Sequence, residues 1–192
     1  MVDILNIQLN LYTNEQLSRY TNRQLELLDF LGYICDRTND DIERWRELRD
    51  KGWDGMTETE RKEWLGEIMP TPSAVKGMYT YKDLNRIEST IEYLAIYFRE
   101  IGYDVPEMTL KLDWKRDDEI TRSEMDRYFS NINTIRNVLR VFPDTPEVPH
   151  TDEVFTHLKA NDIERIIEDV FSITNNLTDS WCYTNEVVSG EV

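Results

Sequence analysis

The sequence predicts an all-α protein, in which an N-terminal helical hairpin region is followed by a three-helix up-down-up bundle. The chain has 192 residues but only seven glycines and six prolines, and long runs without these residues favour helices over many short strands. Several segments carry a threonine three residues before a glutamine or a glutamate, which is the spacing of a helix-capping box. Three stripes of apolar residues at steps of three and four indicate long helices in the second half.

The first segment of the chain is the one place where a strand is predicted. Residues 4–12 alternate between apolar and polar side chains, and a period of two is typical of a short strand. Such a strand could pair with a neighbouring subunit, because strand addition is a common docking mode. A frayed terminus and the start of a helix fit the pattern equally well.

Four threonines predict the starts of helices in the N-terminal region. They are Thr13, Thr21, Thr38 and Thr57. The helix after Thr21 has an apolar face made of Leu25, Leu27, Leu28, Leu31 and Ile34. The helix after Thr38 is expected to stop before Gly52, and Thr57 forms a capping box with Glu60.

Three tryptophans accompany the last two of these helices. Trp45 and Trp64 occupy helical positions, so we expect them to form the core of a small helical hairpin, with Trp53 covering its turn. Stacking against a cofactor or a sugar is the alternative use of such a group.

Two prolines separate the hairpin region from the bundle. Pro70 and Pro72 cannot continue a helix. The predicted division is a strand and helical segment at 1–69, a linker at 70–78, the bundle at 79–178 and a C-terminal tail at 179–192. The aromatic residues of this tail are expected to fold back on the chain's own core or to anchor it to a neighbour.

The bundle is predicted from its three apolar stripes. The first, after Thr80, is Leu84, Ile87, Ile91, Leu94, Phe98 and Ile101. The second, after Thr121 with Glu124, is Met125, Tyr128, Ile132, Ile135, Leu139 and Phe142. The third is Ile163, Ile166, Ile167, Val170, Ile173 and Leu177. Gly102 is placed for a left-handed cap and Pro143 would stop the second helix. Stripes of this length bury one another best as an up-down-up bundle, with connections that cross its ends.

The charge of the chain excludes direct nucleic-acid binding. Asp and Glu total 38 against 22 Lys and Arg, which gives a formal net charge of −16, and such a surface repels phosphate backbones. Solubility is the simplest use of this charge. An acidic DNA mimic or host-enzyme inhibitor is the alternative, but cations such as Arg44, Arg49 and Lys51 interrupt the acidic rows.

The cysteines and the hydropathy indicate synthesis in a cytoplasm. Cys35 and Cys182 are far apart and are expected to be reduced thiols. The start of the chain has no secretory signal. No window approaches the roughly 20 apolar residues of a membrane span, so membrane insertion is not expected.

The sequence lacks the motifs that carry chemistry. His150 and His157 have no partners at metal-ligand spacing, and no glycine-rich phosphate loop is present. No nucleophile lies near either histidine in the sequence. We therefore predict no catalytic, cofactor-binding or metal-ligating residue, no cofactor, and a protein that is not an enzyme.

A series of ordered motifs runs through residues 38–170. They are 40–45, 51–57, 63–65, 76–88, 112–114, 125–128, 131–132, 136, 145–149 and 160–164. As a set they resemble a family of structural proteins from the tail and baseplate region of tailed phages and prophages of Gram-positive gut bacteria. Met78 replaces a small residue that is usual there, and the first 35 residues have no counterpart.

The resemblance implies a virion component that is made in the bacterial cytoplasm and binds other virion proteins or copies of itself. It implies no catalytic residue. For the motif residues we expect roles in the fold. Asp83 would serve the start of its helix, Asn85 and Arg86 would bridge to a neighbouring segment, Asn161 would bind a crossing backbone, and Asp113 with Trp114 would pin the first connection.

Overall fold

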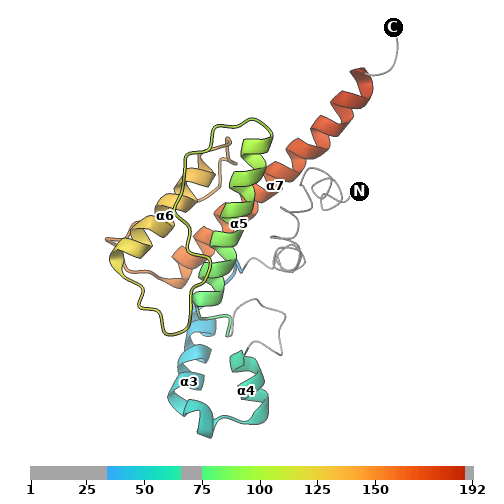
Figure 1. The fold of residues 1–192 in the computed structure, drawn as a ribbon. Coiled ribbons are helices and arrows are strands. Elements are labelled where there is room, and N and C mark those ends of the chain that lie inside the picture. Colours follow the sequence, from blue (N-terminus) through green and yellow to red (C-terminus); the bar gives the residue numbers. More distant parts are fainter. Residues whose placement is uncertain (1–33, 66–74, 189–192) are drawn as a thin grey trace.

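A computed structural model describes residues 34–65 and 75–188 of the chain (Figure 1). These residues form helices and no strand, which confirms the all-α prediction for this part of the chain. The helices are α3 (Asn39–Gly55), α4 (Glu58–Leu65), α5 (Tyr81–Glu100), α6 (Arg122–Arg136) and α7 (His157–Val188). The strand predicted at 4–12, the helices predicted after Thr13 and Thr21, and the linker prolines lie outside the described residues. None of the described helices is long and apolar enough to cross a membrane.

The predicted helix starts are confirmed wherever the structure describes them. The capping boxes pair Thr38 with Asp41, Thr80 with Asp83 and Thr121 with Glu124, and the same two hydrogen bonds join Thr57 to Glu60. Each box satisfies backbone N–H groups that have no partner inside the helix. These N-termini are therefore specified by neighbouring residues in the sequence.

Two glycines shape the helix ends. Gly102 follows α5 with a φ of 93°, the left-handed conformation predicted for it. Gly52 has a φ of 65° inside α3 and kinks the helix there, although α3 continues to Gly55. The regular helix that begins at Asn39 is therefore interrupted at Gly52, as expected, and the helical residues up to Gly55 follow the kink.

The second and third bundle helices end elsewhere than predicted. α6 ends at Arg136 and not beside Pro143. The Arg136 side chain donates to the backbone carbonyl of Pro146 at 2.8 Å and to that of Thr145 at 3.3 Å, which holds the returning chain against the end of α6. α7 continues as a helix to Val188, past the predicted boundary at residue 178. The side chains of the predicted tail lie outside the described part.

The first and third bundle helices are parallel to each other. Arg86 of α5 pairs with Glu164 of α7, and the ring of Tyr93 in α5 lies 6.5 Å from that of Phe171 in α7. The two contacts are seven residues apart along each helix and follow the same order. α5 and α7 therefore run in the same direction (Figure 1).

The middle helix also runs in this direction, so the predicted up-down-up order is wrong for α6. The hydroxyl of Tyr128, in the first half of α6, lies 2.6 Å from that of Tyr79, which precedes α5. Arg127 lies 2.8 Å from Glu88 in the first half of α5. In Figure 1 the colours of α5, α6 and α7 all advance toward the same end of the bundle.

The direction of α6 follows from the course of the connection before it. This connection runs back along the whole of α5, since Arg99 binds the carbonyl of Val105 and Asn85 binds that of Trp114. A helix of 20 residues is about 30 Å long, and an extended segment of similar residue number covers roughly twice that length. The chain therefore has ample length to return and begin α6 beside the start of α5.

The core lies between the three long helices and includes side chains from the first connection. Its buried members are Leu84, Ile87, Ile91, Tyr93, Leu94, Ala95, Tyr97, Phe98, Val105, Trp114, Tyr128, Phe129, Ile132, Ile135, Ile163, Ile166, Ile167 and Val170. Burial of each large apolar side chain contributes about 1.5–3 kcal/mol. Most of these residues belong to the predicted stripes, whereas Val105 comes from the connection.

The hairpin of α3 and α4 has a small core of its own. Leu48, Met56 and Val75 are buried in it, and Trp45 and Trp64 pack against them. Trp53 lies near the turn, 50% exposed, with the Arg61 guanidinium 5.3 Å from its ring centre. The predicted packing role of Trp45 and Trp64 is confirmed.

Candidate functional site

A cluster of four buried charges joins three segments at the foot of the bundle, the end at which α5, α6 and α7 begin. Arg86 of α5 makes two hydrogen bonds to Glu164 of α7, one of them 2.7 Å long. Arg37, which precedes α3, lies 3.3 Å from Asp83 and 3.5 Å from Glu164. All four side chains are buried, and their charges balance. This pairing offsets much of the cost of removing the charges from water.

Asn161 fixes the backbone of the segment that carries Arg37. Its side-chain oxygen accepts from the N–H of Arg37 at 3.0 Å, and its amide donates to the Arg37 carbonyl at 3.0 Å. The Arg37 guanidinium also donates to the carbonyls of Ile34 and Lys76. The predicted role of Asn161 as a partner for a crossing backbone is therefore confirmed.

Asn85 holds the first connection against α5. Its amide donates to the carbonyl of Trp114 at 2.9 Å, and its oxygen accepts from the Trp114 N–H at 2.8 Å. The Trp114 side chain is buried, and the Lys111 ammonium group lies 3.9 Å from its ring centre. Glu88 accepts from the backbone N–H of Lys111. The bridging roles predicted for Asn85 and Arg86 and the anchoring role of Trp114 are confirmed.

Tyr79 lies between the charge cluster and the surface. Its hydroxyl lies 2.6 Å from that of Tyr128, and its ring lies 5.3 Å from the Arg37 guanidinium carbon. Burial raises the pKa of both phenols, so both stay protonated and neutral at physiological pH. The hydrogen bond between the two neutral phenols thus joins the segment before α5 to α6.

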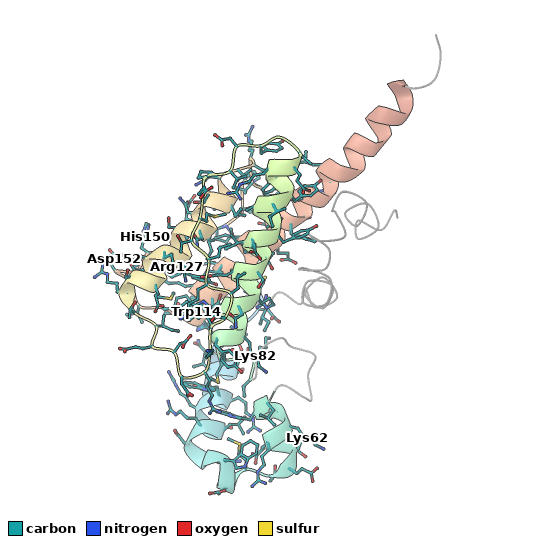
Figure 2. All side chains as sticks on the ribbon, in the orientation of Figure 1. Lys62, Lys82, Trp114, Arg127, His150 and Asp152 are labelled. Atoms are coloured by element: carbon teal, nitrogen blue, oxygen red, sulfur yellow. The ribbon has the colours of Figure 1, made fainter. Side chains whose placement is uncertain are left out.

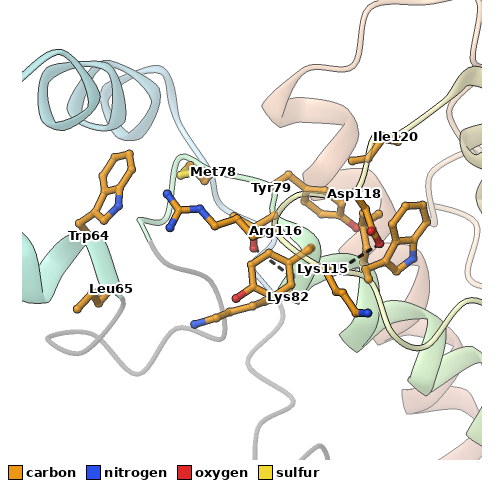
Figure 3. A pocket seen from close by; sticks show the side chains of 13 residues that line it. Trp64, Leu65, Met78, Tyr79, Lys82, Lys115, Arg116, Asp118 and Ile120 are labelled. Carbon is orange, nitrogen blue, oxygen red and sulfur yellow. Dashed lines mark hydrogen bonds between the residues drawn. The ribbon is translucent and has the colours of Figure 1, made fainter. Parts of the chain in front are cut away.

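An open pocket of about 290 Å³ lies in front of this framework, between the end of α4 and the foot of α5 (Figure 3). It is lined by Trp64, Leu65, Met78, Tyr79, Thr80, Tyr81, Lys82, Leu84, Trp114, Lys115, Arg116, Asp118 and Ile120. Leu65 and Ile120 are 46% and 49% exposed. Figure 3 shows the side chains of Lys82 and Arg116 extending across the pocket toward the end of α4. The pocket therefore combines aromatic and aliphatic walls with positive charge.

The positive charge of this pocket is only partly offset by the described residues, because Asp118 of the lining interacts with Lys115 as well as with Lys111. Lys82, Lys115 and Arg116 are exposed, and none of them forms an ion pair within the described part of the chain. Asp118, the acid of the lining, pairs with Lys111 at 2.9 Å, and this hydrogen bond lowers the pKa of Asp118. In a chain with a net charge of −16, three unpaired cations around one pocket form a local site for an anionic group.

A second hollow brings together residue types that occur in hydrolases. It has a volume of about 370 Å³ and is lined by Asp126, Phe129, Ser130, Asn133, Glu147, Val148, Pro149, His150 and Thr151. Asp126 accepts from the Thr151 hydroxyl. Among the described residues no hydrogen bond joins His150 to Ser130 or Asp126, so a nucleophile–base–orienter arrangement is not assembled there.

Metal and thiol chemistry also lack an assembled site in the part of the chain that is described. No group of three or more His, Cys, Asp and Glu side chains there could hold a metal ion. Cys35 lies 3.6 Å from Glu168. Burial, together with the negative charges of Glu168 and Glu164, raises the pKa of Cys35 to about 12. Its thiol is therefore protonated and a poor nucleophile at neutral pH.

The sequence pattern did not predict the basic pocket. Lys82 and Arg116 are 34 positions apart, with ordinary acidic and polar neighbours. Only the return of the first connection to the start of α5 places them together, and no spacing in the sequence signals that course.

Comparison of the chain with protein-family models, with curated proteins and with solved structures gives no match.

Proposed function

We propose that this protein is a non-enzymatic structural subunit of a tailed-phage virion, from the tail, baseplate or fibre-attachment region, and that it acts by binding other virion proteins or copies of itself. The main support for the proposal is the structural role of the residues that carry the family resemblance. Asp83, Asn85, Arg86, Trp114 and Asn161 all join separate segments of the chain. Motif residues of this kind preserve a rigid scaffold, which is what an assembly subunit needs.

The surface supports protein contacts more than small-molecule chemistry. The basic pocket is open and has exposed apolar residues at its rim, including Leu65 and Ile120. Protein interfaces combine such apolar centres with polar rims. The virion itself is inferred from the resemblance.

The acidic DNA mimic remains the alternative, and the charge pattern of the hairpin does not favour it. Its carboxylates pair with cations of the same surface, as in Arg44 with Glu63 at 2.8 Å and Lys62 with Glu58 at 3.1 Å. A mimic of a phosphate backbone needs rows of carboxylates without such partners.

Particle purification tests the proposal. Phage particles released from a bacterium that encodes this chain would be separated on a density gradient and their proteins quantified by mass spectrometry. We expect the chain in the particle fraction at a fixed ratio to the other virion proteins. A chain that stays entirely in the soluble lysate while intact particles sediment without it would overturn the proposal.

A further inference from the structure

The unpaired cations and apolar walls of the basic pocket define the chemistry of its ligand. Lys82 and Arg116 would attract a carboxylate, and the walls around Trp64, Leu65 and Ile120 would accept an aliphatic or aromatic side chain. A short peptide segment with an acidic residue next to exposed apolar residues has both properties. The pocket therefore suits a protein corner more than a free inorganic anion, which would leave the apolar rim exposed.

The chain itself presents such a corner at residues 151–158, immediately before and at the start of α7. Val154 is 82% exposed, Leu158 is 60% exposed and Phe155 is 38% exposed. Asp152 is exposed and forms no ion pair with any residue that the structure describes, whereas Glu153 pairs with Lys159. The corner thus offers one unpaired carboxylate beside a large apolar side chain that the described fold leaves in water.

Within one molecule, Phe155 of the corner packs against Tyr79 of the pocket lining, with ring centres 5.3 Å apart, but Asp152 lies away from Lys82. Figure 2 shows Asp152 at the outer edge of the molecule on the α6 side and Lys82 at the foot of α5. An Asp152 carboxylate that reaches the Lys82 ammonium group must therefore come from another molecule.

We propose that the basic pocket, lined by Lys82, Lys115 and Arg116, binds the 151–158 corner of a second copy of this chain, with Asp152 against the cations and Val154 against the apolar walls. Because donor and acceptor surfaces differ, the contact is head-to-tail and repeats to give a ring or a filament. This inference rests on the proposed function, since it names the partner that the pocket contacts in the assembly.

Sedimentation velocity of the full chain over a range of concentrations tests the contact. We expect the wild-type chain to self-associate. The pocket variant, Lys82→Glu with Arg116→Glu, and the corner variant, Val154→Asp, should each weaken self-association by more than about tenfold. Lys62→Glu is the matched control. It reverses the charge of an exposed lysine of α4 that lies outside the pocket, so it should leave self-association unchanged.

Mixing the two variants gives the sharpest result. The pocket variant retains an intact corner and the corner variant retains an intact pocket, so an equimolar mixture should form one-to-one dimers that grow no further. Circular dichroism melting curves that match the wild type would show that both variants are folded. If a variant is unfolded, a charge swap that combines Lys82→Glu with Asp152→Lys replaces it and should restore self-association relative to Lys82→Glu alone.

Three results would overturn the inference: a wild-type chain that is monomeric at all concentrations, variants that self-associate as the wild type does, or a mixture without dimers. A monomeric chain that nevertheless co-purifies with particles would refute the pocket contact and leave the proposed function standing. A chain absent from particles would refute the proposed function whatever its self-association.

Discussion

At the scale of single residues, the foot of the bundle is held by charges that have been removed from water. Glu164 has no exposed surface and accepts from Arg86. Its partner Arg37 contacts the same carboxylate from a segment 127 residues away in the sequence. Neutral replacement of Glu164 would leave two guanidinium groups with only Asp83 to balance them, and an unbalanced buried charge is costly.

We expect Glu164→Gln to lower the free energy of unfolding by about 3–5 kcal/mol, measured by urea denaturation. Glu147→Gln is the control. Glu147 pairs with Arg136 at 3.0 Å, but its side chain is 87% exposed, and removal of an exposed pair costs less than about 1 kcal/mol. Equal losses for the two variants would contradict the structural role of the buried cluster.

The capping carboxylate of α4 makes the hairpin sensitive to acid. A hydrogen bond from Lys51, followed by that from the backbone N–H of Thr57, lowers the pKa of Glu60 from 4.5 to about 2. Because the folded-state pKa lies below the unfolded one, this contribution to stability is present above pH 4.5 and is lost as the pH falls toward 2. Unfolding followed by tryptophan fluorescence should therefore depend less on pH in Glu60→Gln than in the wild type over this window. An unchanged pH dependence would show that Glu60 does not make this contribution.

The residues of the foot were predictable to different degrees. The roles of Asp83, Asn85 and Asn161 follow from short polar side chains at or near helix starts, where they can bind backbone groups. Arg37 gave no such signal, because its partners Asp83 and Glu164 are 46 and 127 residues away. Partners at that separation are brought together only by the fold.

At the scale of elements, helix starts were predictable and helix directions were not. A capping box lies within four residues, so Thr38, Thr80 and Thr121 could be read directly. The direction of α6 depends on whether the preceding connection turns at the top of α5 or runs back along it. That choice is made by distant contacts such as Asn85 with Trp114, and hydrophobic periodicity is the same for both directions.

The close approach of two elements explains a glycine in the 76–88 motif. A Cβ atom at Gly77 would lie 2.2 Å from the carbonyl oxygen of Asp41, at the start of α3, whereas one at Gly55 would meet only the Lys51 side chain at 3.7 Å. We expect Gly77→Ala to force α3 away from this segment and to lower the free energy of unfolding by roughly 1–3 kcal/mol.

Gly55→Ala supplies the matched control for that substitution. The added methyl group makes an ordinary contact there, so thermal melting should differ little from the wild type. If both variants lost a comparable amount of melting temperature, the close approach of the α3 backbone would not explain why a glycine occupies position 77.

At the scale of the whole molecule, the described chain is a bundle of three parallel helices with a small hairpin at its foot (Figure 1). Both connections between bundle helices run back along its length, and the first contributes Val105 and Trp114 to the core. The returning connection also creates the basic pocket, since Lys115 and Arg116 follow Trp114. The course of the first connection thus determines both the direction of α6 and the position of the basic pocket.

Spin labels test the direction of α6. Labels at Lys82 and Ser123 would mark the first turns of α5 and α6, and labels at Lys82 and Asn133 would mark opposite levels of the bundle. Double electron–electron resonance should give a shorter distance between labels at Lys82 and Ser123 than between labels at Lys82 and Asn133. The reverse order would restore the up-down-up arrangement and remove the framework of the pocket.

The central claim is that this protein works through contacts with neighbouring protein molecules. Native mass spectrometry of the full chain, drawn from gently disrupted particles, tests it most directly. We expect the chain in complexes whose masses equal several copies, or one or more copies with other virion proteins. A chain detected only at its monomer mass, under conditions in which other virion subcomplexes survive, would contradict the claim.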